Sequence, residues 1–383
     1  MAAVDFCNLY FLKIPLRIRV THGARADRTF SDSIIVRING HGFHGYGEAV
    51  VRDYVSGPVA KGSELRREAS ETVSRLLAPF EGKDFGWEET AASLAGLSCS
   101  DRELPFLCAV ETALLDLSCR REGRDVYSIL GREPARTEIS YGGVVPILQP
   151  GEAEKYLRFL AGFGLPDAKV KLSGDPEYNS WILGLCRSTL GAAFDLRVDA
   201  NSSWGVHDAR KLFDVCERHG VRLIEQPFPA SGGQAAEEMR AARARGFQIM
   251  ADEGILSSQD LRRLASEGAY SAVNLRLSKN GGLTRVLLLA EEARANGLSC
   301  QLGCMVGETG ILSALGRIAA SLLPEALHVE GSYDDQLLTD NITVKSLGFG
   351  PGGKAPVLRG QALGYEVSPE KLAALSVEQA SCS

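Results

Sequence analysis

The sequence predicts an α/β fold, a (β/α)8-type, TIM-like barrel with an α+β N-terminal capping domain that the C-terminal segment completes. Two observations favour this fold. From about residue 137 onward, short apolar runs alternate with helical segments, as in a chain of strand–helix units. Several of these runs end in a charged residue at steps of 26 to 28 residues, close to the roughly 30 residues of one βαβ unit.

The predicted capping domain covers residues 1–130. Residues 5–50 alternate and turn like antiparallel strands, with turns rich in His, Gly, Asn and Asp. Segments 64–80 and 105–121 are expected to be helices, because apolar residues recur in the second at helical spacing. The polar loop 20–32 is of a kind that can act as a lid over a site, and His22 lies within it.

The predicted barrel covers residues 131–340, and its elements alternate between strand and helix. Strands are expected near 138–145, 168–172, 195–199, 221–226, 248–252, 272–277, 298–303 and 327–331, with helices between them such as 207–219, 234–245, 258–267 and 283–296. Residues 341–383 include GFGPGGKAP, which is too rich in Gly and Pro for a further strand–helix unit. This segment is expected to return and pack on the capping domain.

Composition narrows the class of protein. The chain has 383 residues, 45% apolar and 23% charged, as expected for a globular enzyme. The net charge of −6 argues against a nucleic-acid surface, and no apolar run approaches the roughly 20 residues that a membrane span needs. Nine scattered cysteines without a C-x-x-C pair, and no evident secretory signal, predict a reduced cytoplasmic protein.

Three carboxylates lie at the ends of three successive apolar runs: Asp199, Glu225 and Asp252. In a barrel these strand ends meet on one face. A set of oxygen ligands without nearby Cys or His suits a hard cation, Mg²⁺ first and Mn²⁺ as the alternative. Asn201 and Glu253 directly follow two of these acids and are expected to support them. The competing interpretation is that the acids only cap the helices that follow.

Lysines complete the pattern. Lys169 and Lys171 lie two apart in AKVKL, so both should point to the same face of one strand. Two ammonium groups inside a barrel are costly unless negative charge faces them, and partial burial lowers a lysine pKa toward the range of a general base. Lys279, in SKNGG, is expected on the opposite side of the barrel axis. The alternative is that these lysines lie on an outer surface or only pair with acids.

Other charged residues lie near the expected rim. Glu308 follows the seventh apolar run in MVGETG, whereas Asp334 and Asp335 follow the eighth in EGSYDD. Each is a candidate for substrate binding, with a loop charge or helix cap as the alternative. Among the six histidines, which form no metal-ligand spacing, His22 in the expected lid is the candidate for a substrate contact.

The ordered set of motifs resembles the enolase superfamily, within it the muconate-lactonizing subgroup of the mandelate racemase/muconate lactonizing enzyme family, and is dipeptide-epimerase-like. The resemblance spans nearly the whole chain and is carried by GYGE (45–48), AVETALLDL (109–117), KVK (169–171), VDAN (198–201), EQP (225–227), ADE (251–253), KNGG (279–282) and MVGET. It implies Mg²⁺ held by Asp199, Glu225 and Asp252. It also implies Lys171 and Lys279 as an acid/base pair, with Lys169 binding the substrate carboxylate.

The resemblance implies a Mg²⁺-dependent isomerase that abstracts the α-proton of a metal-bound carboxylate to give an enediolate. Reprotonation on the opposite face would make it a racemase or epimerase of a dipeptide or N-acyl amino acid. The alternatives are a muconate-lactonizing type of cycloisomerase, an o-succinylbenzoate-synthase-like β-elimination, or a barrel that binds without catalysis. Dipeptide epimerases typically carry Asp-x-Asp here, of which Asp334 matches only the second Asp, and muconate cycloisomerases usually carry a Glu where Ser332 stands, so this segment does not choose between the two subgroups. Relatives of this kind also imply a homo-oligomer.

Overall fold

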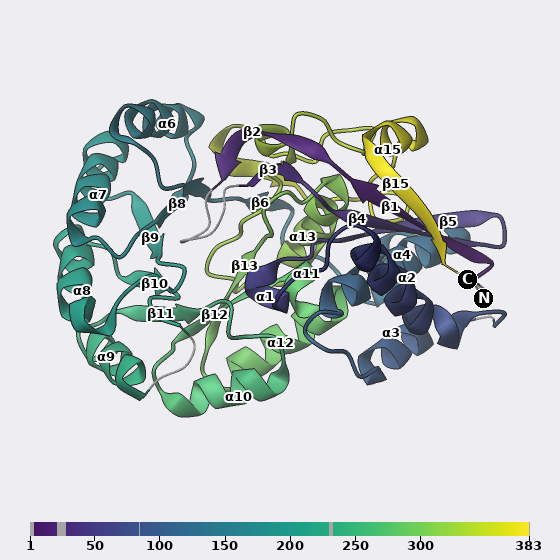
Figure 1. The fold of residues 1–383 in the computed structure, drawn as a ribbon, viewed down its shortest axis with the longest axis horizontal. Helices are drawn as coiled ribbons and strands as arrows, with labels where there is room; N and C mark the ends of the chain where they lie inside the picture. Colours follow the sequence, from purple (N-terminus) through teal and green to yellow (C-terminus); the bar gives the residue numbers. More distant parts are fainter. Residues whose placement is uncertain (1–3, 21–27, 84, 230–232, 383) are drawn as a thin grey trace.

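The predicted fold is confirmed by a computed structural model, which describes residues 4–20, 28–83, 85–229 and 233–382 (Figure 1). A seven-stranded parallel sheet with the order β13-β12-β11-β10-β9-β8-β7 curls into the barrel. Its strands are β7 (Gly143–Val145), β8 (Asp167–Lys171), β9 (Asp195–Asp199), β10 (Leu223–Glu225), β11 (Gln248–Ala251), β12 (Ala272–Arg276) and β13 (Ser299–Gly303).

Two of the expected strands differ from the prediction. The first is divided into β6 (Glu138–Ser140), which pairs with β14 (Lys354–Pro356), and β7, which pairs with β8. The eighth forms only an isolated bridge between Leu302 and Val329. Backbone hydrogen bonds still join residues 327–330 to β13, and the Gly142 amide donates to the Val329 carbonyl on the other side. This short segment therefore closes the ring between β13 and the start of β7.

Helices cover the outside of the barrel (Figure 1). They are α6 (Pro150–Phe163), α7 (Pro176–Leu190), α8 (Ala209–Arg218), α9 (Gly233–Ala244), α10 (Ser258–Glu267), α12 (Leu283–Ala295) and α13 (Gly310–Leu322), with the short α11 (Leu277–Asn280) directly after β12. Local sequence sets their starts. Ser257 and Asp260 form a capping box at α10, so two otherwise unpaired backbone amides are satisfied there.

The capping unit is an antiparallel sheet with helices on one face. The sheet order is β15-β1-β4-β5, from β1 (Phe6–Leu12), β4 (Ile34–Gly40), β5 (Phe43–Ala49) and β15 (Ser376–Cys382). Its helices are α1 (Asp53–Ser56), α2 (Ser63–Leu77), α3 (Trp87–Gly96), α4 (Leu104–Glu122) and α5 (Val126–Leu130). The long α4 lies directly on β5, where a Cβ at Gly47 would come within 1.8 Å of the Ala109 carbonyl oxygen. Glycine is therefore required for this close approach.

The last part of the chain returns to the first. The helices α14 (Asp334–Leu337) and α15 (Pro369–Leu375) follow the barrel, and β15 then pairs antiparallel with β1. Figure 1 shows β15 beside β1 at this edge. Between capping sheet and barrel runs the hairpin β2 (Ile14–Val20) and β3 (Arg28–Ser31). The expected lid loop 20–32 is described only at its two ends, and His22 lies outside the described residues.

Within the described residues, no helix combines the length and the apolar character needed to cross a bilayer.

Candidate active site

Three carboxylates lie together at the carboxyl ends of neighbouring strands. Asp199 ends β9 and Glu225 ends β10, and the strand register places these two residues side by side. Asp252 follows β11, the next strand of the sheet. All three side chains are enclosed, with exposed fractions of 0% or 1%. Three buried acids in one place require nearby positive charge.

Lys169 and Lys171 supply part of that charge from β8. The Lys169 ammonium donates to Glu225 Oε2 at 3.1 Å and lies 3.6 Å from Asp199 Oδ2. The Lys171 ammonium donates to Asp199 Oδ2 at 2.6 Å and to Asn201 Oδ1 at 2.8 Å. Both lysines therefore point inward, as their two-residue spacing predicts.

A further acid, Glu330, fixes Lys169 from the other side. Glu330 Oε2 accepts from the Lys169 ammonium at 2.9 Å, and its Oε1 accepts from Arg197 at 2.9 Å. Burial raises the pKa of Glu330, but Lys169 and Arg197 outweigh that effect and leave the pKa well below its ordinary value. For Lys169, burial lowers the pKa, and Glu225 and Glu330 more than reverse this. Lys169 is therefore held as a cation.

On the sixth strand, the structure differs from the expectation. Lys279 does not face the barrel mouth: it is fully buried in α11 and donates to the Asp252 carbonyl at 2.6 Å, to Asp252 Oδ1 at 2.9 Å and to the Asn274 carbonyl at 2.7 Å. The side chain that faces the site from this strand is Arg276. Its guanidinium contacts Asp252 closely and lies 3.4 Å from Glu225 Oε1. The expected position of Lys279 opposite Lys171 is thus corrected.

Strand geometry explains this difference. Side chains two apart on a strand share a face. Asn274 points to the site, where its Nδ2 donates to Glu225 Oε1 at 2.7 Å, so Arg276 points there as well. Lys279 lies beyond the strand, on a helical turn that redirects its side chain. The regular step of 27 residues from Asp252 identifies Lys279 but does not predict its direction, since it counts positions in the chain and not faces of the strand.

The donor set fits a divalent cation in its chemistry. Three carboxylates from adjacent strands offer only oxygen atoms, as Mg²⁺ prefers. Within the described residues, no three acidic, His or Cys side chains are already arranged around one point. The acids are instead turned toward Lys169, Lys171, Arg276 and Lys279. Two polar atoms beside the cluster, Asn201 Nδ2 and Asn274 Oδ1, are buried without a hydrogen-bond partner. The site therefore has one donor and one acceptor that can still bind a further group.

The residues expected to support the acids lie beside them. Asn201 has a left-handed backbone, with φ of 43°, and its amide donates to Asp199 Oδ1 at 2.8 Å. Burial raises the pKa of Glu253 to about 7, and the neighbouring Asp252 adds to this effect. For Asp252 itself, burial raises the pKa, whereas Arg276 and Lys279 bring it below the ordinary value. The ion pairs thus keep Asp252 ionised.

The cluster borders a cavity of about 620 Å³, here called the central cavity. Lys169, Lys171 and Arg276 line its floor. Its walls are largely apolar, with Ile18, Val144, Pro146, Tyr156, Phe159, Met305 and Leu337 among the lining residues. Ile18 and Phe159 are exposed and give the rim an apolar surface. The cavity therefore combines a cationic floor with an apolar rim.

Two of the expected rim acids line this cavity in different ways. Burial raises the pKa of Glu308 to about 8, and its Oε1 accepts from the Met305 amide at 2.6 Å. Asp334 is turned toward the protein: it accepts from Ser313 at 3.0 Å and from Asn341 at 2.7 Å. Asp334 thus braces the loop after the barrel, while Glu308 carries a proton at neutral pH.

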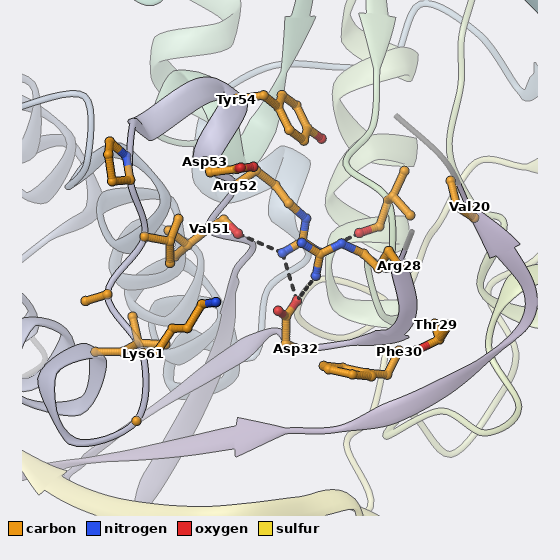
Figure 2. Close-up of a pocket in the computed structure, with 16 residues that line it drawn as sticks. Val20, Arg28, Thr29, Phe30, Asp32, Val51, Arg52, Asp53, Tyr54 and Lys61 are labelled. Carbon is orange, nitrogen blue, oxygen red and sulfur yellow. Dashed lines mark hydrogen bonds and ion pairs between the residues drawn. The ribbon is translucent and has the colours of Figure 1, made fainter. Parts of the chain in front are cut away.

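A second cavity of about 790 Å³, the cap-side cavity, lies between the capping unit and the barrel. It shares Val20 and Val306 with the central cavity. Figure 2 shows the Asp32 carboxylate between the guanidinium groups of Arg28 and Arg52, at 2.7 Å and 2.8 Å. Arg52 is buried and also donates to the Val306 carbonyl at 2.6 Å. This contact ties the capping unit to the loop that carries Glu308.

Sequence reasoning missed Arg276 and Glu330. Both end apolar runs, in VNLR and in HVE, by the same rule that identified Asp199 and Glu225. Asn274 and Arg276 lie two apart on one strand and therefore share a face, and this spacing would have identified Arg276. Glu330 is the charged residue at the end of the eighth apolar run and would have been identified in the same way as Asp199, but the interpretation of that segment rested on Ser332 and Asp334.

Known proteins with the same fold have related activities in their names. The chain is 30% identical to the L-Ala-D/L-Glu epimerase of Escherichia coli (strain K12), over 79% of this chain and 85% of that protein. Its structure is similar to that of a dipeptide epimerase from Cytophaga hutchinsonii complexed with Mg and D-Ala-L-Val, with a TM-score of 0.84, 21% identity and full coverage of both chains.

It is also similar to a muconate lactonizing enzyme from Pseudomonas fluorescens, with a TM-score of 0.85, 23% identity and coverage of 98% and 99% of the two chains. At these identities the two structural similarities show the fold. A model described as Enolase C-terminal domain-like matches residues 152–371, more than half of the chain, and the chain therefore belongs to the enolase superfamily, in the family of muconate lactonizing enzymes and mandelate racemases.

Proposed function

We propose that this protein is a Mg²⁺-dependent isomerase that removes the α-proton of a small carboxylate, acting as a racemase or epimerase of a dipeptide or N-acyl amino acid. The observation that carries the proposal is the position of Lys171. Its ammonium lines the central cavity directly beside the carboxylate of Asp199. Relatives with epimerase activity in their names support the same class of reaction.

Each residue of the floor has a distinct task in this proposal. Asp199, Glu225 and Asp252 hold the cation, which when bound supplies positive charge that stabilises the enediolate. Lys169, kept charged by Glu330 and Glu225, attracts the substrate carboxylate. Lys171, which lies beside Asp199 and Asn201, takes the α-proton from one face as the neutral amine and becomes an ammonium. Burial of Lys169 and the three acids makes these electrostatic effects stronger than they would be in water.

Inversion requires a proton donor on the other face of the substrate. In the sheet, β8 with Lys171 and β12 with Arg276 are separated by three strands, so they lie across the barrel mouth. A guanidinium does not lose its proton in proteins and is therefore a poor proton carrier. Glu308, with a pKa of about 8, holds a proton at neutral pH and lines the same cavity. We assign the second proton transfer to Glu308 and charge stabilisation to Arg276.

Arg276 also favours a second candidate function. A cycloisomerisation or β-elimination needs proton transfer on one face only, so Lys171 would suffice and Arg276 would stabilise developing negative charge. The muconate lactonizing enzyme of similar fold is consistent with this alternative. The two reactions differ in product: epimerisation changes the configuration alone, whereas the alternatives make a ring or a double bond.

The walls of the central cavity suggest which carboxylates fit. Ile18 and Phe159 at the rim, with Tyr156 below them, would contact a substituent beyond the α-carbon. We therefore expect apolar N-acyl groups or dipeptides with apolar residues to be preferred over highly charged ones. Burial of a single leucine-sized group is worth about 1.5–3 kcal/mol, enough for a clear preference.

The deciding experiment is α-proton exchange in D₂O. The Mg²⁺-loaded protein is incubated with a panel of apolar and charged dipeptides and N-acyl amino acids, and deuterium incorporation and chirality are followed by NMR and chiral chromatography. Exchange with inversion supports epimerisation, and a new ring or alkene supports the alternative. Lys171→Ala serves as the inactive control. A folded, metal-loaded protein that exchanges no α-proton of any compound would refute the proposal.

A homo-oligomer and a location in the cytoplasm are further parts of this proposal. All nine cysteines are free thiols in the structure, which is consistent with a reducing compartment. Light scattering coupled to size exclusion would measure the oligomeric state.

A further inference from the structure

Two cysteines meet where the two ends of the chain meet. Cys7 on β1 and Cys382 on β15 are direct partners in the antiparallel register. Side chains of directly opposite strand residues lie on the same face of a sheet, so these two thiols are neighbours. Among the described residues, no other two cysteines are strand partners. The two strands that carry the pair, β1 and β15, lie at the outer edge of the capping sheet, away from the barrel strands that carry the carboxylate cluster (Figure 1).

The strand register is compatible with a disulfide. Directly opposite residues on antiparallel strands have Cα atoms about 4.5 or 5.5 Å apart and side chains on the same face. A disulfide bond requires a Cα separation of about 4.4–6.8 Å. Formation of the bond therefore needs rotation of the two side chains and little movement of the strands.

The two thiols differ in accessibility and acidity, as a thiol exchange reaction requires. Cys7 is 2% exposed, whereas Cys382 is half-buried and meets an oxidant first. The neighbouring Cys7 thiol lowers the pKa of Cys382, and Ser70 and Ser74 on α2 add to this effect. The neighbouring Cys382 thiol, together with burial, raises the pKa of Cys7. Cys382 is thus the nucleophile of the pair.

We propose that Cys7 and Cys382 form a reversible disulfide that fastens the last strand to the first. The oxidant is a low-molecular-weight disulfide of the glutathione class. The Cys382 thiolate attacks one sulfur of the oxidant, whose S–S bond breaks and releases one thiolate. Cys7, after losing its proton, then attacks the Cys382 sulfur and displaces the second thiolate. The protein loses two hydrogens, and the oxidant is reduced to two thiols.

This bond would act on β15. That strand is the outermost of its sheet and has only β1 as a strand neighbour. A disulfide between residues so far apart closes a loop of nearly the whole chain, which restricts the unfolded state strongly. The oxidised protein should therefore melt at a higher temperature than the reduced one, and β15 should no longer be able to detach.

The test uses the full chain in glutathione buffers of graded redox ratio, followed by alkylation of free thiols and trypsin digestion. Cleavage after Lys13 and Lys371 leaves Cys7 alone in peptide 1–13 and Cys382 alone in peptide 372–383. We expect these two peptides to be cross-linked under oxidising conditions and to separate on reduction. The cross-link should vanish in Cys382→Ser and persist in Cys99→Ser, a half-buried cysteine on another segment.

Thermal melting provides the second readout. Oxidation should raise the melting temperature of the wild type and of Cys99→Ser by several degrees, and should leave that of Cys382→Ser unchanged. Complete alkylation of Cys7 and Cys382 at every redox ratio would overturn the proposal. So would an oxidised wild type whose melting temperature matches that of oxidised Cys382→Ser.

Discussion

At the scale of single residues, Arg276 and Lys279 lie in different surroundings, although only three positions separate them in the chain. Arg276 lines the central cavity, whereas Lys279 is enclosed and satisfies Asp252 from behind. A residue that meets substrate affects turnover, and a residue that neutralises a buried acid affects stability. The two positions can therefore be separated by measuring both quantities in the same variants.

We predict that Arg276→Met loses most of its activity and also part of its stability, because Arg276 pairs with buried Asp252 and Glu225 as well as lining the cavity, whereas Lys279→Met chiefly loses stability. Loss of Arg276 removes a charge-stabilising donor, for which a fall in kcat of about 10²–10³ is typical. Loss of Lys279 leaves Asp252 less compensated, at a cost of about 3–5 kcal/mol. Steady-state kinetics and urea unfolding measure the two effects. A Lys279→Met protein with normal stability but no activity would return Lys279 to the catalytic role first expected.

Glu308 predicts a pH dependence. Its pKa is raised from 4.5 to about 8, so the folded protein keeps a proton that the unfolded chain releases across that interval. The favourable effect of this proton on stability is therefore fully present below about pH 4.5 and is lost as the pH rises toward 8. Activity that needs the protonated carboxyl should likewise fall above about pH 8.

The measurement is the pH profile of kcat/KM for the wild type and for Glu308→Gln. We expect the fall near pH 8 to be absent in the variant, because an amide does not titrate, and epimerisation to be slow at every pH. Exchange of the α-proton without inversion should survive, since Lys171 is unchanged. An unaltered alkaline limb in Glu308→Gln would show that another group titrates there.

At the scale of elements, the capping unit depends on how closely α4 approaches β5. A Cβ at Gly47 would lie 1.8 Å from the Ala109 carbonyl oxygen, which is backbone and has little freedom to move. At Gly96, in the last position of α3, a Cβ would meet nothing within 4 Å. The two glycines thus provide a matched pair for testing this packing.

We predict that Gly47→Ala destabilises the protein by about 3 kcal/mol, at the upper end for overpacking, because helix and strand must separate. Gly96→Ala should be neutral or stabilise by up to about 1 kcal/mol, since alanine restricts the unfolded chain. Chemical denaturation of both variants measures the difference. Equal stability of the two would mean that α4 is displaced from β5 at little cost.

At the scale of the whole molecule, sequence reasoning was effective where a residue's task follows from its position on a repeating unit. Asp199, Glu225 and Lys171 end strands, so the repeat predicted their convergence, and the structure places them together. It was unreliable where a side chain's direction depends on local backbone. Lys279 follows Asp252 at the regular spacing of the repeat, but it lies on a helical turn and not at the end of the strand. The expected eighth strand is only a bridge in the structure, yet Glu330 at its end holds Lys169 in the site.

The carboxylate cluster connects three strands, so cation binding should stabilise the entire barrel. Asp199, Glu225 and Asp252 are drawn toward ammonium and guanidinium groups, and Mg²⁺ would compete with these for the same oxygens. A ligand that binds only the folded state adds about 2.7 kcal/mol at one hundred times its dissociation constant. We therefore predict that Mg²⁺ raises the melting temperature in a saturable way and that a chelator reverses the rise. Asp199→Asn, measured at matched ionic strength, should lose most of this response, and an equal rise in that variant would place the cation elsewhere on the protein.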